Sequence, residues 1–124
     1  MVIVVLTVFT ASILSPTSLM TGVAFERGQR AEQQGDYATA VSEYKKVLER
    51  FPDSTVATAR LGIAYAEAGN DAEAMQQLGK LGGRKTSPKL AEEVHYAMDQ
   101  IYTRIETNAR RSKPAADSDS GDSR

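Results

Sequence analysis

The chain reads GDYATA at residues 35–40 and GNDAEA at residues 69–74, so one short stretch recurs in modified form 34 residues later. The recurrence extends towards the N-terminus, because Gly28 is matched by Gly62 at the same spacing. A fixed period of this length is typical of stacked supersecondary units, none of which can bury its apolar face alone. Stacks of this kind bind other proteins far more often than they catalyse reactions. The period therefore indicates a class of fold and a class of function.

Each unit is expected to be a pair of helices joined by a tight turn. The residues before Gly35 are rich in Ala, Glu, Gln and Arg, which favour helix. Gly35 can take the left-handed conformation that ends a helix, and Asp36 can cap the next one. Apolar side chains then recur every three or four residues up to Phe51, and Pro52 ends this second helix. The first unit is therefore predicted to be a helix–turn–helix.

Small residues occupy equivalent places in the two units. Gly62 lies inside a predicted helix, where it costs about 1 kcal/mol relative to Ala, so it needs a packing reason. Gly28 is its equivalent, and Ala40 and Ala74 form a second equivalent pair. We expect neighbouring helices to approach closely at these four positions.

The residues of the two units resemble the tetratricopeptide repeat, a 34-residue helical hairpin. Its W-x2-L-G-x2-Y pattern is matched by Leu61-Gly62-x2-Tyr65, and its A-x3-F and P by Ala40-x3-Tyr44 and Pro52. The resemblance implies an all-α fold, a short tetratricopeptide-type α-solenoid of stacked helical hairpins with about five helices. The domain is expected at residues 25–111, with repeats at about 21–52 and 55–82 and a capping helix at about 88–110.

The capping helix has a pattern of its own. Ser87 and Pro88 suit its start, and apolar side chains from Leu90 to Ile105 fall on one helical face. The period places Tyr96 where Gly62 stood, so this segment is not a third full repeat. It is expected to end the stack with a polar outer face.

The first 25 residues carry no charged side chain, and Met1 to Leu14 is almost continuously apolar. This run fits the hydrophobic region of a secretory signal, and Gly22-Val23-Ala24 offers a cleavage site that would start the mature chain at Phe25. No Lys or Arg precedes the run, so an uncleaved anchor is the alternative, and a buried strand or core helix is a third. Of these, a signal peptide or an N-terminal membrane anchor is the expectation for residues 1–24. We expect an exported protein, periplasmic or secreted, or else one anchored to the inner membrane.

The remaining sequence predicts no catalytic machinery. The chain has no cysteine, its single histidine is His95, and no Gly-rich phosphate loop precedes a helix. The formal net charge of −1 gives no electrostatic footprint for nucleic acid. We therefore expect no enzyme activity, no cofactor, no metal and no nucleic acid. Residues 112–124 contain no large apolar side chain and are expected to be a disordered tail.

The family resemblance also implies where a partner binds. In tetratricopeptide repeats the first helix of each unit lines a concave face that contacts a peptide or a partner helix. The resemblance therefore implies a non-catalytic interaction scaffold or adaptor, exported or tethered to a membrane through residues 1–24, that binds a protein or peptide. A self-associating structural protein (a homo-oligomer) and an accessory subunit of an envelope complex are the alternatives. The expected partner-binding residues are Phe25, Gln29, Glu32, Gln33, Val56, Ala59, Ile63 and Glu67.

Overall fold

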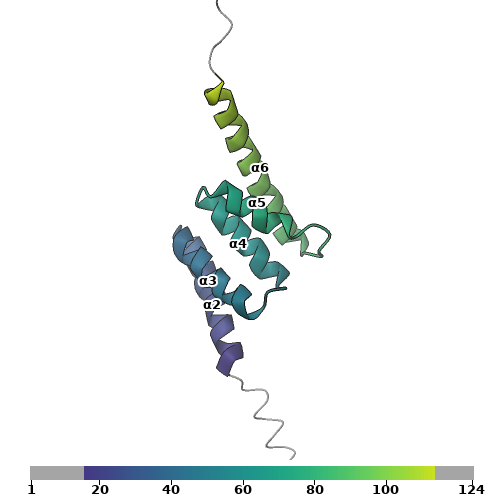
Figure 1. The fold of residues 1–124 in the computed structure, drawn as a ribbon. Helices are drawn as coiled ribbons and strands as arrows, with labels where there is room; N and C mark the ends of the chain where they lie inside the picture. The colour runs from purple at the N-terminus through teal and green to yellow at the C-terminus, as the bar shows by residue number, and fades with distance from the viewer. Residues whose placement is uncertain (1–15, 114–124) are drawn as a thin grey trace, which may run out of the picture.

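The computed structural model describes residues 16–113, which fold into stacked helices with no strand in that range (Figure 1). The predicted all-α architecture with five helices is confirmed. The apolar run at residues 1–14 and nearly all of the expected tail lie outside the described residues. The helices are α2 (Pro16–Gln33), α3 (Tyr37–Arg50), α4 (Thr55–Glu67), α5 (Asp71–Gly79) and α6 (Pro88–Ser112).

The two hairpin turns have the same geometry 34 residues apart. Gly35 and Gly69 have φ angles of 74° and 80°, in the left-handed region that favours glycine. In each turn the amide that follows the glycine donates a 2.9 Å hydrogen bond to a carbonyl in the last turn of the preceding helix. This is the Schellman arrangement that satisfies helix-end carbonyls. The donor and acceptor pairs are Asp36–Ala31 and Asn70–Tyr65.

Side-chain caps start α3, α4 and α6, and two of them, Asp36 and Ser87, were expected from the sequence. Asp36 accepts from the Thr39 amide at 3.1 Å, Ser54 caps α4, and Ser87 caps α6. The hydroxyl of Thr39 also donates to Asp36, and these hydrogen bonds lower the pKa of the Asp36 carboxyl. The caps therefore fix the helix boundaries locally, before any long-range packing is considered.

Within each hairpin, a glycine of the first helix receives a large side chain of the second. A Cβ atom on Gly28 would come within 2.6 Å of the Tyr44 ring, and one on Gly62 within 2.5 Å of Leu78. Gly62 and Leu78 lie 34 residues after Gly28 and Tyr44, so both units use the same contact. The close approach expected at these glycines is confirmed. Ala40 and Ala74 are fully buried.

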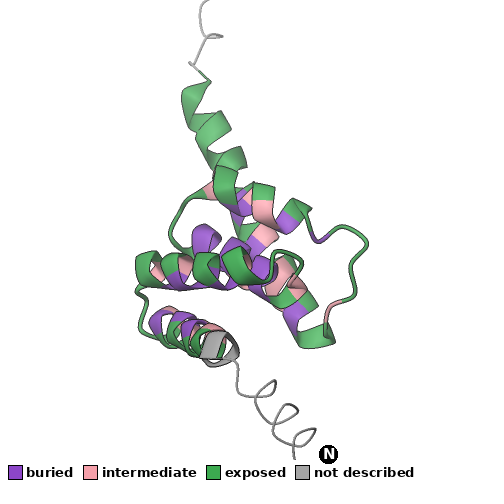
Figure 2. Cartoon of the chain, turned by 60° about the horizontal axis from the view of Figure 1, so that its bottom comes forward, coloured by how far each residue is buried: buried purple, intermediate pink, exposed green. Residues whose placement is uncertain are grey.

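Helix α4 lies at the centre of the stack. It packs against α3 and α5, and α6 covers it from a further side while also touching α5. Every residue of α4 from Ala57 to Ala66 is buried except Arg60 (Figure 2). A helix that is apolar on most of its circumference needs neighbours on most sides.

Two expectations drawn from helical periodicity are wrong. Phe51 and Ile105 were expected on apolar faces, but 50% and 48% of their surfaces are exposed. Phe51 follows the last residue of α3, and Ile105 lies in the second half of α6, which extends beyond the other helices (Figure 1). Helix α2 begins at Pro16, before the first repeat expected at about residues 21–52.

Replacing Gly62 with Ala should lower the free energy of unfolding by about 1–3 kcal/mol through overpacking, despite the better helix propensity of Ala. The new methyl group would meet Leu78 Cγ at 2.7 Å and its backbone nitrogen at 3.3 Å. Urea unfolding followed by circular dichroism measures the change. Gly79→Ala is the matched control, because no atom lies within 4 Å of its Cβ position. Equal stability of the two variants would contradict the close-contact assignment.

Candidate protein-binding groove

An open depression of about 250 Å³ lies where α2 and α4 face the same side of the stack. We name it the Arg60 groove; its lining consists of Gln29, Glu32, Gln33 and Arg60. Three of these residues come from the second half of α2, at positions that the family resemblance implies for the concave face. The walls therefore carry two amides, one carboxylate and one guanidinium, and no large apolar side chain.

Arg60 connects three helices at the floor of this groove. Its Nη1 atom lies 2.5 Å from an oxygen of Glu93 on α6 and 3.6 Å from an oxygen of Glu32 on α2. The three side chains are between 15% and 31% exposed. Partial burial of this kind makes the interaction stronger than that of a fully exposed ion pair. The Nε atom of Arg60 is buried and has no hydrogen-bond partner among the described residues.

Glu32 is held from the opposite side by Tyr44. The Tyr44 hydroxyl donates a 2.5 Å hydrogen bond to Glu32 Oε2. Burial raises the pKa of the Tyr44 phenol, and its hydrogen bond to the Glu32 carboxylate raises that pKa further. Because Tyr44 also packs on Gly28, the hairpin contact and the groove share one side chain.

Helix α6 limits how far the groove extends over α4. Arg104 on α6 binds both oxygens of Asp71 at the start of α5 and donates a 2.9 Å hydrogen bond to the carbonyl of Ala66 near the end of α4. This contact and the Arg60–Glu93 pair fasten α6 along α4 at two points. The concave face of α4 is therefore covered by a helix of the same chain.

The eight residues predicted to bind a partner fall into three groups. Gln29, Glu32 and Gln33 line the Arg60 groove together. Ala59 and Ile63 belong to the core, where they are 0% and 6% exposed, so the expectation that Ile63 can reach a ligand is wrong. The other three lie outside the groove: Phe25 is half-buried with its ring centroid 5.6 Å from that of Tyr44, and Val56 and Glu67 are exposed.

The groove has the chemistry of a polar binding surface. Gln29 and Gln33 each offer amide donors and an acceptor, which can pair with the main chain of an extended peptide. Glu32 lines the groove, and Glu93 pairs with Arg60 from outside the lining. Two carboxylates therefore surround the single Arg60 guanidinium, so the local charge favours a neutral or basic ligand. Within residues 16–113 no group of three or more His, Cys, Asp and Glu side chains is placed to hold a metal ion.

Comparison with known families agrees with this geometry. The family model described as tetratricopeptide repeat matches residues 31–100. The chain belongs to the tetratricopeptide repeat family. Repeats of this family generally mediate protein–protein interaction and typically form non-catalytic scaffolds. The comparisons with curated proteins and with solved structures gave no significant match.

Among the helices of residues 16–113, none has the length and apolar character needed to cross a bilayer.

Two residues of the site were missed by sequence reasoning. Arg60 is the one charged residue between Val56 and Ala66 in an otherwise small and apolar helix. This isolated charge could have predicted an ion pair, because a charged side chain within a buried helix needs a partner. Glu93 carried no such signal, since its pairing depends on where α6 lies along α4.

Replacing Arg60 with Met should lower the free energy of unfolding by about 1–3 kcal/mol, because Glu32 and Glu93 would lose their shared cation while staying partly buried. Urea unfolding again provides the measurement. Arg110→Met is the matched control: its ion pair with Glu106 joins side chains that are 78% and 66% exposed, so a change below about 0.5 kcal/mol is expected. If both variants keep the stability of the native chain, Arg60 does not fasten the three helices.

Proposed function

We propose that this protein is a non-catalytic adaptor that binds an extended segment of a partner protein in the Arg60 groove. The observation that carries the proposal is the convergence of Gln29, Glu32, Gln33 and Arg60 on one open depression of a tetratricopeptide stack. The amide side chains of Gln29 and Gln33 suit main-chain recognition, and the two carboxylates that surround Arg60 suit lysine or arginine on the ligand. The partner is therefore a polar segment that carries basic side chains.

The groove should be tested with a random peptide library screened against the full chain. Peptides that bind should be enriched in Lys and Arg. The double variant Gln29→Ala, Gln33→Ala should weaken the selected peptides about fivefold or more, which corresponds to a loss of about 1 kcal/mol. Isothermal titration calorimetry measures the affinities.

The matched control for this experiment is Gln34→Ala. Gln34 is an exposed glutamine directly after Gln33 but does not line the groove. Its replacement should leave affinity unchanged. If the double variant binds as the native chain does, or if Gln34→Ala weakens binding equally, the partner uses another face.

The adaptor is further proposed to remain attached to a membrane through its N-terminal segment. Ala24 is 7% exposed and packs with Val47 and Ala57 in a small core cluster. Cleavage after Ala24 would remove this residue together with the first half of α2. The loss would uncover Val47 and Ala57, which supports retention of the segment rather than its removal.

Retention predicts a definite mature N-terminus. Mass spectrometry of the protein from fractionated cells should find chains that begin before Pro16, and these should sediment with membranes. Recovery of a chain that begins at or near Phe25 in a soluble fraction would instead establish the cleaved, exported form.

A further inference from the structure

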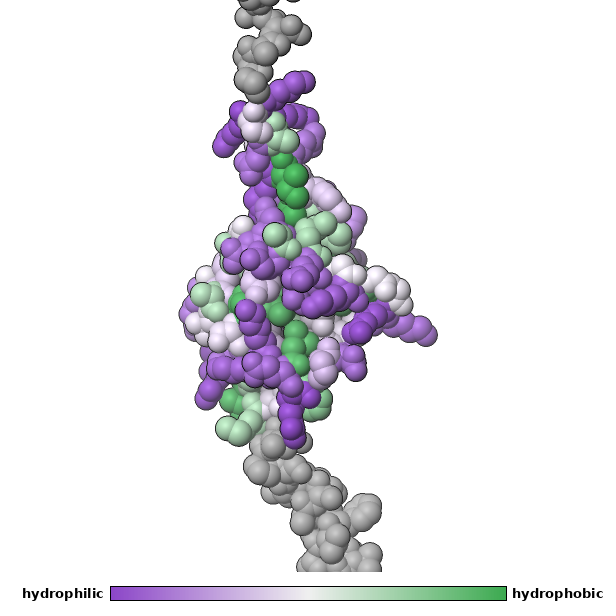
Figure 3. Space-filling view, viewed as in Figure 1, coloured by the Kyte–Doolittle hydropathy of each residue, from purple (hydrophilic) through white to green (hydrophobic). Residues whose placement is uncertain are grey.

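One end of the α2–α3 hairpin exposes large apolar side chains in a cluster. Met20 is 75% exposed, Val23 is 41% exposed, and Phe51, directly after α3, is 50% exposed. Met20 and Val23 are about one turn apart on α2, and antiparallel packing brings the end of α3 beside them. Some apolar surface is visible at this end in the space-filling view, beside hydrophilic side chains (Figure 3). Exposed apolar clusters on small domains mark sites of interaction.

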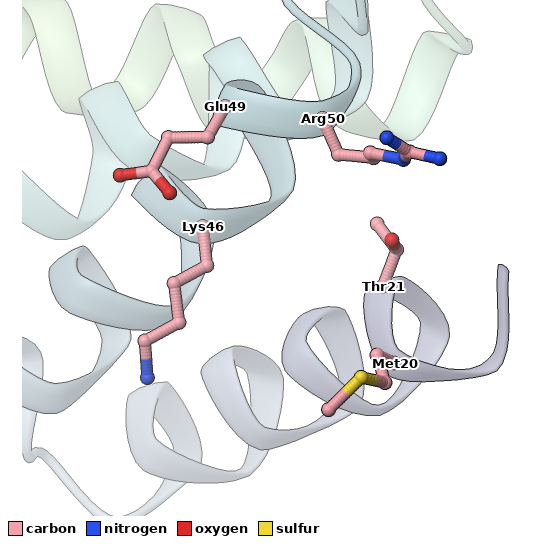
Figure 4. A pocket seen from close by; sticks show the side chains of 5 residues that line it. All are labelled: Met20, Thr21, Lys46, Glu49 and Arg50. Carbon is pink, nitrogen blue, oxygen red and sulfur yellow. The ribbon is translucent and has the colours of Figure 1, made fainter. Parts of the chain in front are cut away.

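Basic side chains flank this cluster. Figure 4 shows Met20 and Thr21 on α2 facing Lys46, Glu49 and Arg50 on α3 across an open depression. Arg50 also lines a neighbouring depression with Phe51, so the apolar and basic groups form one continuous surface. Arg50 makes no ion pair within residues 16–113.

Acidic groups lie at this end too. Lys46 pairs with Glu43 at 2.5 Å, Asp53 lies 3.8 Å from Arg84, and Glu49 faces the depression. The charges therefore nearly balance, and a strongly charged partner gains little here. Apolar contact supplies the attraction, while Lys46 and Arg50 can extend their long side chains towards phosphate groups.

The covalent connection of residues 1–15 to α2 restricts what can cover this surface. Residues 1–15 join α2 at Pro16, and Leu14 precedes Met20 by only six residues. Even a fully extended chain would place Leu14 within about 20 Å of Met20. Any bilayer that holds the uncharged Met1–Leu14 run must therefore lie beside the exposed cluster.

We infer that the surface formed by Met20, Val23, Lys46, Arg50 and Phe51, here named the basal face, rests on the interfacial region of a phospholipid bilayer. The inference rests on the proposed membrane attachment and adds a second contact to it. Residues 1–15 hold the chain at the membrane, and the basal face fixes how the domain is oriented there. The Arg60 groove then faces partners at a defined height above the lipid.

Tryptophan fluorescence tests this inference directly, because the chain contains no Trp. Phe51→Trp places one reporter on the basal face, and Tyr102→Trp places a matched reporter on α6, at 53% exposure against 50% for Phe51. Figure 1 shows that the second half of α6 points away from the start of α2. Both full-length variants are reconstituted into phosphatidylcholine–phosphatidylglycerol vesicles, with or without brominated acyl chains, and their flotation with the vesicles is measured.

If the basal face contacts lipid, both variants should float with the vesicles. Only the Phe51→Trp variant should then shift its emission to the blue and be quenched by brominated lipid. Adding Met20→Ser and Val23→Ser to that variant should reduce the quenching without reducing flotation. Flotation of the Phe51→Trp variant without quenching would overturn the basal-face contact and leave the tether standing. Absence of flotation would overturn both. A blue shift that grows with protein density but is insensitive to bromine would mean that a second protein covers this face, which also overturns the inference.

Discussion

The whole stack depends on the insertion of one large side chain over one glycine in each hairpin. Tyr44 occupies the space above Gly28, and Leu78 occupies the space above Gly62. Any side chain at either glycine would push the two helices apart. Because both hairpins close in the same way, they present equivalent faces, and α4 can pack on α3 to continue the stack. Tyr44 then reaches past the contact to Glu32, so the closure of the first hairpin also positions the groove.

Helix α6 ends the stack of repeated hairpins. A further repeat would have continued the stack in the same direction, but α6 lies chiefly along α4, fastened by Glu93 and Arg104. It buries Leu90, Ala97 and Ile101 in the common core. The apolar part of the concave face is thereby used for internal packing. What remains for a partner is the polar strip on α2 and the Arg60 side chain.

The local rules of this fold could be read from the sequence, while the contacts between distant segments could not. Gly35, Asp36 and Ser87 act within a few residues, so their turn and cap roles follow from residue type alone. The fate of Ile63 and Ile105 depends on where α6 lies, which no periodicity specifies. Ile63 belongs to the same core cluster as Leu90, Ala97 and Ile101 of α6. Ile105 lies in the second half of α6, which extends beyond the other helices (Figure 1). The family resemblance predicted the three α2 residues of the groove, Gln29, Glu32 and Gln33. It did not predict Arg60 or the ion pair between Arg60 and Glu93.

Helix α2 joins the two proposed surfaces in one rigid element. Its first half carries Met20 and Val23 on the basal face, and its second half carries Gln29 and Gln33 on the groove. At 1.5 Å per residue, Met20 and Gln29 are roughly 14 Å apart along the helix axis. The Gly28–Tyr44 contact lies between them and holds this part of α2 against α3. A partner bound in the groove would therefore be kept close to the lipid surface by the helix itself, without any need for a long or ordered linker.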